Sequence, residues 1–354
     1  MHKGKFDALL ERYEQFWVRS NSDRCILNLS APISAQTFRG HASLEEKWLD
    51  ADYICKQYKF NTSQTFYVAE GVPMLFTNLG PGCFSACVGG PFVLAENTIW
   101  FDSAPIVTDW QNPPALQFDQ GSEMWQHIER LQARFAVEGF HFSITDLGGI
   151  MDIVSSLRGA EALLYDLYDY PEEVRAFTRR VKDLWFEGYQ KQIETIKATG
   201  QPYNNWMNIP SKKPWYPIQC DFCAMISPAH FETFVLEDLV EQANRIDRTI
   251  YHLDGKGELP HLDMILDIPS LTGVQWVPGD GQPEHWDEQW FWIYRKIQDK
   301  KKTLVLSGGL SDLDMPGAER LIKSIDPRGV YISATCSSPD GAKRLLENVE
   351  RWSE

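Results

Sequence analysis

Two kinds of segment alternate along most of the chain. Short apolar runs of five to seven residues, bounded by polar residues, glycine or proline, are typical of buried strands. Segments in which apolar residues recur every three or four positions are typical of amphipathic helices. The expected strands are residues 24–30, 72–78, 140–145, 202–208, 249–254, 273–278, 303–307 and 329–334.

Helical segments separate these runs, and this alternation indicates the fold class. Helices are expected after Ser43, after Gly149, from Pro171 to Gly200, from Ser227, over 286–299, after Pro316 and from Ser338. The alternation favours a parallel sheet, and eight such strands predict an α/β fold, a (β/α)₈ TIM barrel, in which residues 1–354 form a single domain. A doubly wound open sheet is the alternative, but no expected strand is followed by a glycine-rich phosphate turn.

Two segments fall outside the alternation. Residues 2–18 carry apolar side chains at helical spacing among charges, so they predict an N-terminal helical extension. Residues 79–139 follow the second expected strand and are rich in glycine and proline, which predicts a long loop insertion. Such an insertion is a candidate lid or substrate loop.

Polar or reactive side chains stand where several expected strands end. They are Asn78, Asp146, Asn208, His252 with Asp254, Gln275 with Trp276, Ser307 and Cys336. In a barrel of parallel strands the carboxyl ends share one rim, and that rim holds the active site. We therefore expect these side chains to converge on one rim.

Three of these residues are candidate zinc ligands. His252 and Asp254 are two positions apart and so point to the same side of a regular strand, and Cys336 ends the eighth expected strand. One histidine, one carboxylate and one thiolate would leave a fourth zinc position open, as catalytic zinc sites do. The alternative is a hydrogen-bonded His–Asp pair and a cysteine that only fills space in the core.

Tryptophan is abundant, with 13 in the chain, and most must pack in the core. Trp206 and Trp276 lie near the carboxyl ends of expected strands, so we expect these two to form pocket walls.

The charge balance restricts the possible partners. A formal net charge of −15 argues against binding to nucleic acid or to an anionic membrane surface. No apolar run approaches the roughly 20 residues that span a bilayer. Seven scattered cysteines do not resemble a disulfide framework, and the N-terminus is charged rather than signal-like, so a cytoplasmic protein is expected.

Several motifs in the second half of the chain resemble one known family. They are residues 142–146 with Asp152, residues 157–159, residues 166–174, residues 221–228 and residues 251–255. These segments look like the uroporphyrinogen decarboxylase superfamily. The resemblance implies a (β/α)₈ barrel with one of two chemistries, cofactor-free decarboxylation of a porphyrinogen or zinc-dependent methyl transfer involving corrinoid proteins.

The decarboxylase branch matches less well. Its members resemble one another in an arginine-rich segment after the first strand, where this chain keeps only Arg39 nearby. Their essential aspartate corresponds to Asn78, and the tyrosine expected after the third strand corresponds to Ser155. A neutral amide cannot stabilise a developing cation by charge.

The methyltransferase branch matches better, with one departure. Its members resemble one another in a His-x-Cys and a distant Cys that bind zinc; this chain has His252 and Cys336 but Asp254 in place of the first Cys. The resemblance implies a methyltransferase or demethylase that transfers a methyl group between a small substrate and a thiol or a partner corrinoid protein. In that scheme His252, Asp254 and Cys336 hold zinc, and Asn78 and Asp146 position the substrate. The alternatives are a non-catalytic or metal-free ligand-binding barrel and, less favoured, a decarboxylase or lyase acting on another acid.

Overall fold

The structure is organised around a curved, mostly parallel sheet. It is a computed structural model and describes residues 3–354. Seven strands are hydrogen-bonded in the order β2-β1-β9-β8-β7-β6-β5. They are β1 (Ile26–Pro32), β2 (Thr65–Ala69), β5 (Trp215–Gln219), β6 (Arg248–Asp254), β7 (Gly273–Val277), β8 (Thr303–Ser307) and β9 (Val330–Thr335).

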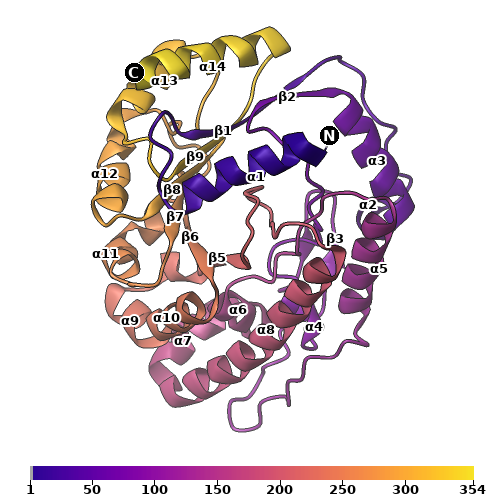
Figure 1. The fold of residues 1–354 in the computed structure, drawn as a ribbon. Helices are drawn as coiled ribbons and strands as arrows, with labels where there is room; N and C mark the ends of the chain where they lie inside the picture. The colour runs from indigo at the N-terminus through magenta and orange to yellow at the C-terminus, as the bar shows by residue number, and fades with distance from the viewer. Residues whose placement is uncertain (1–2) are drawn as a thin grey trace.

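Helices cover the outer face of this sheet, as the strand-helix alternation predicts. Figure 1 shows the helices of the C-terminal half along the outside of the curved strands. They are α9 (Pro228–Phe234), α10 (Leu236–Arg245), α11 (Leu262–Leu266), α12 (Phe291–Asp299), α13 (Met315–Ser324) and α14 (Pro339–Ser353), with the short 3₁₀ helices η1 (Asp221–Met225), η2 (Lys256–His261) and η3 (Glu288–Trp290). The α/β class is therefore confirmed.

The remaining elements precede β5. They are α1 (Lys3–Trp17), α2 (Leu44–Leu49), α3 (Ala51–Ser63), α4 (Phe84–Cys87), β3 (Val93–Leu94), β4 (Ile99–Trp100), α5 (Glu123–Val137), α6 (Ile150–Arg158), α7 (Ala160–Asp169) and α8 (Pro171–Thr199). Local signals fix several boundaries. Ser43 Oγ accepts a hydrogen bond from Glu46 N at the start of α2, and Gly200 ends α8 at φ 70°, a left-handed conformation that glycine adopts at little cost.

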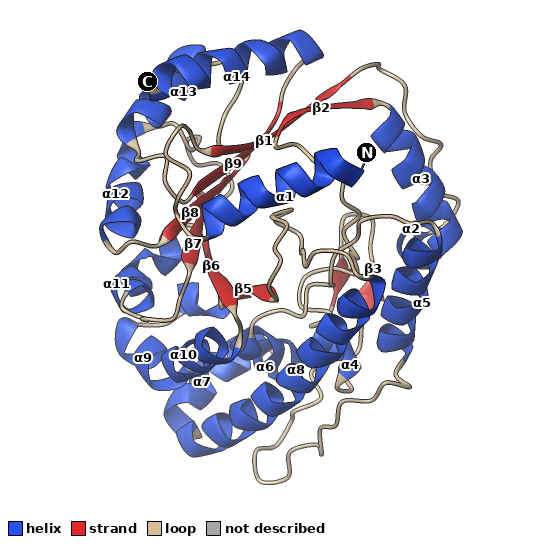
Figure 2. Cartoon of the chain, in the orientation of Figure 1, coloured by secondary structure: helices blue, strands red, loops and turns tan. Residues whose placement is uncertain are grey.

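The closed ring of eight strands is not confirmed, because the sheet is open. Three expected strands, residues 72–78, 140–145 and 202–208, do not form ladders. Leu75 and Phe142 make an isolated parallel bridge, and Ile144 N donates to Asn204 O at 3.2 Å. Figure 2 shows loops on the side of the molecule between β2 and β5. Asn208, at φ 54°, cannot continue an extended strand.

Several elements of the first two-thirds of the chain were not predicted. β2 pairs antiparallel with β1, and β5 pairs parallel with β6, although residues 215–219 were expected to be loop. The expected loop insertion at 79–139 contains α5, a helix of 15 residues whose first turn is capped by Ser122. It also contains the short β3–β4 hairpin.

Helix α1 covers the inner side of the sheet. It confirms the predicted N-terminal helix; position 2 of that prediction lies outside the described residues. Figure 1 shows α1 crossing the space that the strands curve around. Tyr13, Phe16 and Trp17 pack there against Trp215 and Tyr331 in a second core, separate from the larger core beneath the outer helices. Trp17 Nε1 donates to Pro210 O at 3.1 Å.

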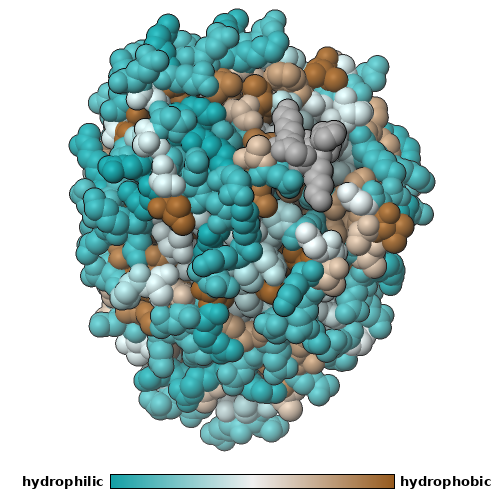
Figure 3. Space-filling model, viewed as in Figure 1, coloured by the Kyte–Doolittle hydropathy of each residue, from teal (hydrophilic) through white to brown (hydrophobic). Residues whose placement is uncertain are grey.

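The surface carries no extended apolar region on the face that includes α1. Figure 3 shows this face as largely hydrophilic, with small hydrophobic patches separated from one another. Within residues 3–354, no helix combines the length and the hydropathy that crossing a membrane requires.

Candidate active site

His252 and Asp254 lie together at the carboxyl end of β6. Residues two apart on a strand share a face, and His252 Nε2 is 4.0 Å from Asp254 Oδ2. The His252 side chain is mostly buried and the Asp254 side chain is 44% exposed. The pair therefore joins a fixed imidazole to a carboxylate that solvent can reach.

A hydrogen-bonded chain across three strands fixes the His252 ring. Gln275 stands opposite His252 in the β6–β7 register, and its Oε1 is 2.6 Å from His252 Nδ1. Gln275 Nε2 donates to Ser307 Oγ on β8 at 2.8 Å, so Oε1 is the atom that faces the imidazole. An amide oxygen can only accept, which assigns the proton of the neutral ring to Nδ1 and leaves Nε2 with its lone pair.

Trp206 forms a wall beside this histidine. Its ring meets the His252 ring edge-on, with centroids 5.0 Å apart and an interplanar angle of 86°. Trp276 does not reach the same place: it is fully buried and packs against Trp290 with ring centroids 5.1 Å apart. Because it alternates with Gln275 along β7, its side chain points to the opposite face of the sheet.

Cys336 follows β9 and is 2% exposed, and its backbone N donates to Ser30 O at 2.7 Å. Burial and, secondarily, the Asp312 carboxylate raise the pKa of the Cys336 thiol to about 11. Among residues 3–354, no three histidine, cysteine or acidic side chains are grouped so that they could hold a metal. His252, Asp254 and Cys336 as they lie therefore do not fit a three-ligand zinc site.

Asp146 lies below the surface near the same histidine. Its Oδ1 accepts hydrogen bonds from Gly148 N at 2.9 Å and from the Tyr216 hydroxyl at 3.2 Å. Burial is the main reason that the pKa of Asp146 rises to about 6, and the charge of Asp221 raises it further. A positive charge on His252 opposes this shift, so the two side chains are electrostatically linked.

Two further acids stand close to Asp146. Asp152 on α6 accepts hydrogen bonds from the backbone N of Asp221 at 3.1 Å and of Phe222 at 2.8 Å. Burial and the neighbouring Asp221 raise the pKa of Asp152 to about 7. Both carboxylates line a cavity of about 190 Å³ beneath the β3–β4 hairpin.

These acids and Tyr216 were not among the predicted site residues. Tyr216 lies on β5, and Asp221 follows that strand directly, so both depend on a strand that the sequence analysis missed. The available signal was the apolar run from Trp215 to Gln219, which Pro217 interrupts.

Asn78 is placed apart from His252. It is exposed, and its Oδ1 accepts a hydrogen bond from Gly80 N at 3.1 Å. It lines a separate surface pocket together with Arg39 and Trp48. This setting shows no contact with the other predicted site residues.

A pocket of about 370 Å³ opens at the carboxyl ends of β1, β8 and β9, and we call it the mouth pocket. Trp206 and Ser307 both line it, and both contact the His252 assembly, Trp206 directly and Ser307 through Gln275. The mouth pocket therefore lies next to the His252 assembly.

Comparisons with known proteins show the fold. No protein-family model matches the sequence, and no curated protein matches it. Among solved structures, the chain is similar to a methyltransferase from Methanosarcina mazei, with a TM-score of 0.59 over 98% of this chain and 99% of that chain. The two sequences are 13% identical, so the likeness shows a shared fold.

Proposed function

We propose that this chain is a methyltransferase-type enzyme that transfers a methyl group between a small substrate in the mouth pocket and an acceptor. The observation that carries the proposal is the His252 ring, which Gln275 holds by Nδ1 so that Nε2 keeps its lone pair. Trp206 and, through Gln275, Ser307 connect this ring to the lining of the mouth pocket. The fold shared with a methyltransferase and the resemblance to the uroporphyrinogen decarboxylase superfamily support it. Fold alone does not assign chemistry, so the side-chain geometry is the stronger support.

In this proposal each residue has a limited role. His252 Nε2 accepts a proton from the attacking group or holds an electrophile, Asp254 stabilises positive charge on the ring, and Asp146 adds to that stabilisation from below. Trp206 excludes water from one side of the histidine. The acceptor is a thiol or the corrinoid of a partner protein.

The proposal extends to the finer architecture. Backbone hydrogen bonds link Leu75 to His141 and Ser143, and Ile144 to Asn204. The three segments are thus connected in the order that the second, third and fourth strands of a (β/α)₈ barrel would have. We propose a single-domain barrel whose second to fourth strands are irregular. The seven free cysteines are compatible with a cytoplasmic protein.

Zinc remains a separate hypothesis with its own test. The ligands would be His252, Asp254 and Cys336, and Cys336 would have to move and lose its proton to join the other two. Elemental analysis of the wild type and of the His252→Ala and Cys336→Ser variants measures this. Near-stoichiometric zinc that is lost in both variants supports the ligand set; zinc that persists in Cys336→Ser excludes that cysteine.

A methyl-transfer assay tests the function itself. The purified chain is incubated with a panel of methyl donors and either a thiol or a reduced corrinoid protein, and methylated product is measured. We expect His252→Ala to lower the rate by roughly 10²- to 10⁴-fold, the range for a lost acid-base group. His230→Ala, on α9, is the matched control and should stay near the wild-type rate. A wild type that transfers no methyl group while still binding ligands would make the chain a binding protein.

A further inference from the structure

The mouth pocket is lined without a charged side chain. Among the described residues that line it, none is aspartate, glutamate, lysine, arginine or histidine. Five of its polar side chains come from the parallel strands β1, β8 and β9: Asn28, Ser30, Ser307, Ser333 and Thr335. Asn208 and the tyrosines Tyr67 and Tyr331 add further uncharged polar groups. This composition is unusual for a chain with 83 formally charged side chains, 34 basic and 49 acidic.

A charged ligand would find no counter-charge here. An ion that leaves water loses its hydration, and an opposite charge or several aligned dipoles must compensate that loss. The uncharged polar groups of this lining compensate only a small part of it. The net charge of −15 opposes an anion further; it favours a cation only at long range, where salt screens the interaction. Asp152 and Asp221 do not supply a counter-charge to a cation in the mouth pocket, because they line a different cavity.

The same groups suit an uncharged oxygen compound. Ser307 Oγ accepts from Gln275 Nε2, and Ser333 Oγ accepts from Gly308 N at 3.1 Å, so each hydroxyl keeps its own O–H to donate. Ether and alcohol oxygens accept such bonds. Trp206, Met74 and Val72 supply an apolar side against which carbon can pack.

We propose that the mouth pocket selects an uncharged oxygen-bearing molecule, a neutral alcohol or methyl ether, and discriminates against charged analogues of the same size. The inference rests on the proposed function in one respect: it takes the bound molecule to be the substrate of the methyl transfer. Its selectivity is a property of the pocket, and it can be measured without any reaction.

Three probes of matched size test the selectivity: 2-methoxyethanol, methoxyacetate and 2-methoxyethylammonium. Binding of each to the full chain is followed by ligand-observed NMR titration. We expect the neutral probe to bind at least roughly tenfold more tightly than either ion. Equal or tighter binding of an ion, or no binding of any probe, would overturn the proposal.

Two variants locate the selectivity in the pocket. Ser333→Asp places a carboxylate in the lining, and we expect it to favour the ammonium probe over 2-methoxyethanol. Ser333→Ala removes one hydrogen-bond donor but adds no charge. It should therefore weaken the binding of 2-methoxyethanol while keeping the order of the three probe affinities. If Ser333→Asp leaves the order unchanged with the fold intact by circular dichroism, the probes bind elsewhere and the proposal fails. Neutral selectivity without methyl transfer would retain this inference and remove the proposed function.

Discussion

At the scale of single residues, the orientation of the His252 ring depends on Gln275, a residue distant in sequence, more than on its neighbours along β6. The sequence pattern pairs it with Asp254 and Cys336, whereas its shortest contact is with Gln275 at 2.6 Å. Gln275 was recognised as a strand-end residue but was given no role. Its position opposite His252 follows from the register of β6 and β7, which a single sequence does not show.

Replacing Gln275 should release the imidazole. In Gln275→Leu, the ring loses the acceptor that holds the proton on Nδ1, so ¹⁵N NMR should show a mixture of the two neutral tautomers instead of one. The buried donor left without a partner should also cost about 1–3 kcal/mol in the free energy of unfolding. Gln289→Leu, at an exposed position, controls for the substitution itself. An unchanged single tautomer in Gln275→Leu would contradict the assigned role.

Glu258 provides a test of pH dependence. It is fully buried, the Tyr251 hydroxyl donates to its Oε2 at 2.9 Å, and burial raises the pKa of its carboxyl from 4.5 to about 11. The folded state therefore keeps a proton that the unfolded state loses above pH 4.5. Stability from this group is complete below that pH and falls as pH rises towards the folded pKa.

The Glu258→Gln variant keeps an acceptor for Tyr251 but cannot ionise. Its stability relative to the wild type should increase with pH between about 6 and 9, by up to roughly 1.4 kcal/mol per pH unit. Urea unfolding at several pH values measures the difference. Glu237→Gln, on the exposed face of α10, should show a much smaller trend, and parallel curves for Glu258→Gln and the wild type would refute the buried-proton argument.

At the scale of elements, the sequence located β1, β6, β7, β8 and β9, missed β2 and β5, and predicted three strands that form no ladder. The expected strand at 303–307 coincides with β8, and residues 249–254 fall within β6. β5 was missed because Pro217 argues against a strand, yet β5 is at the end of the sheet order, where a proline is tolerated. Residues 202–208 carry Tyr203, Trp206 and Met207 among three asparagines, and the left-handed Asn208 ends any extended run.

Helix α1 offers a test at this scale. Phe16 is fully buried in the core between α1 and the inner face of the sheet, so Phe16→Ala should lower the free energy of unfolding by about 3–5 kcal/mol. Val18 follows the same helix but is 65% exposed, so Val18→Ala should change stability by less than about 0.5 kcal/mol. Urea denaturation of both variants makes the comparison. Similar small effects would mean that α1 does not contribute to the core.

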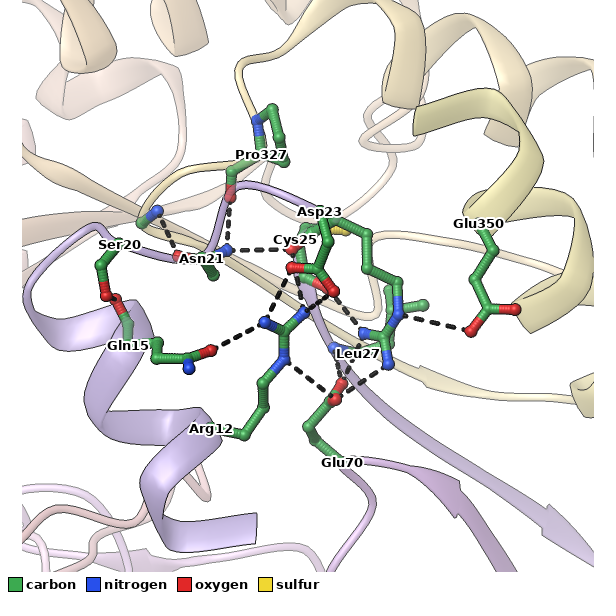
Figure 4. A network of polar contacts seen from close by, with 12 residues as sticks. Arg12, Gln15, Ser20, Asn21, Asp23, Cys25, Leu27, Glu70, Pro327 and Glu350 are labelled. Carbon is green, nitrogen blue, oxygen red and sulfur yellow. Dashed lines mark hydrogen bonds and ion pairs between the residues drawn. The ribbon is translucent and has the colours of Figure 1, made fainter. Parts of the chain in front are cut away.

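At the scale of the whole molecule, a buried ionic network joins distant parts of the chain. Figure 4 shows Glu70 next to Arg12 and Leu27. Glu70 is 4% exposed and accepts from Arg24 Nη1 at 2.7 Å, from Arg24 Nη2 at 2.9 Å and from Leu27 N at 2.9 Å. It thus ties α1, β1 and the end of β2 together.

Removing Glu70 should leave two arginines without their buried partner. We expect Glu70→Ala to cost about 3–5 kcal/mol in the free energy of unfolding, because an uncompensated buried charge is expensive. Glu350 also pairs with Arg24, but at 3.7 Å and with a side chain that is 55% exposed, so Glu350→Ala should cost less than about 1 kcal/mol. Chemical denaturation distinguishes them; equal losses would show that burial does not set the difference.

The sequence by itself determined the α/β class, the N-terminal helix, the strands with continuous apolar runs and the placement of His252 next to Asp254. These follow from local periodicity and from the two-residue repeat of a strand, which depend only on near neighbours. The tertiary structure decided the open sheet, the Gln275 contact, the separation of Cys336 from His252 and Asp254, and the uncharged lining of the mouth pocket. Those features depend on strand register and on which distant segments meet, and neither is encoded in the pattern of a single segment.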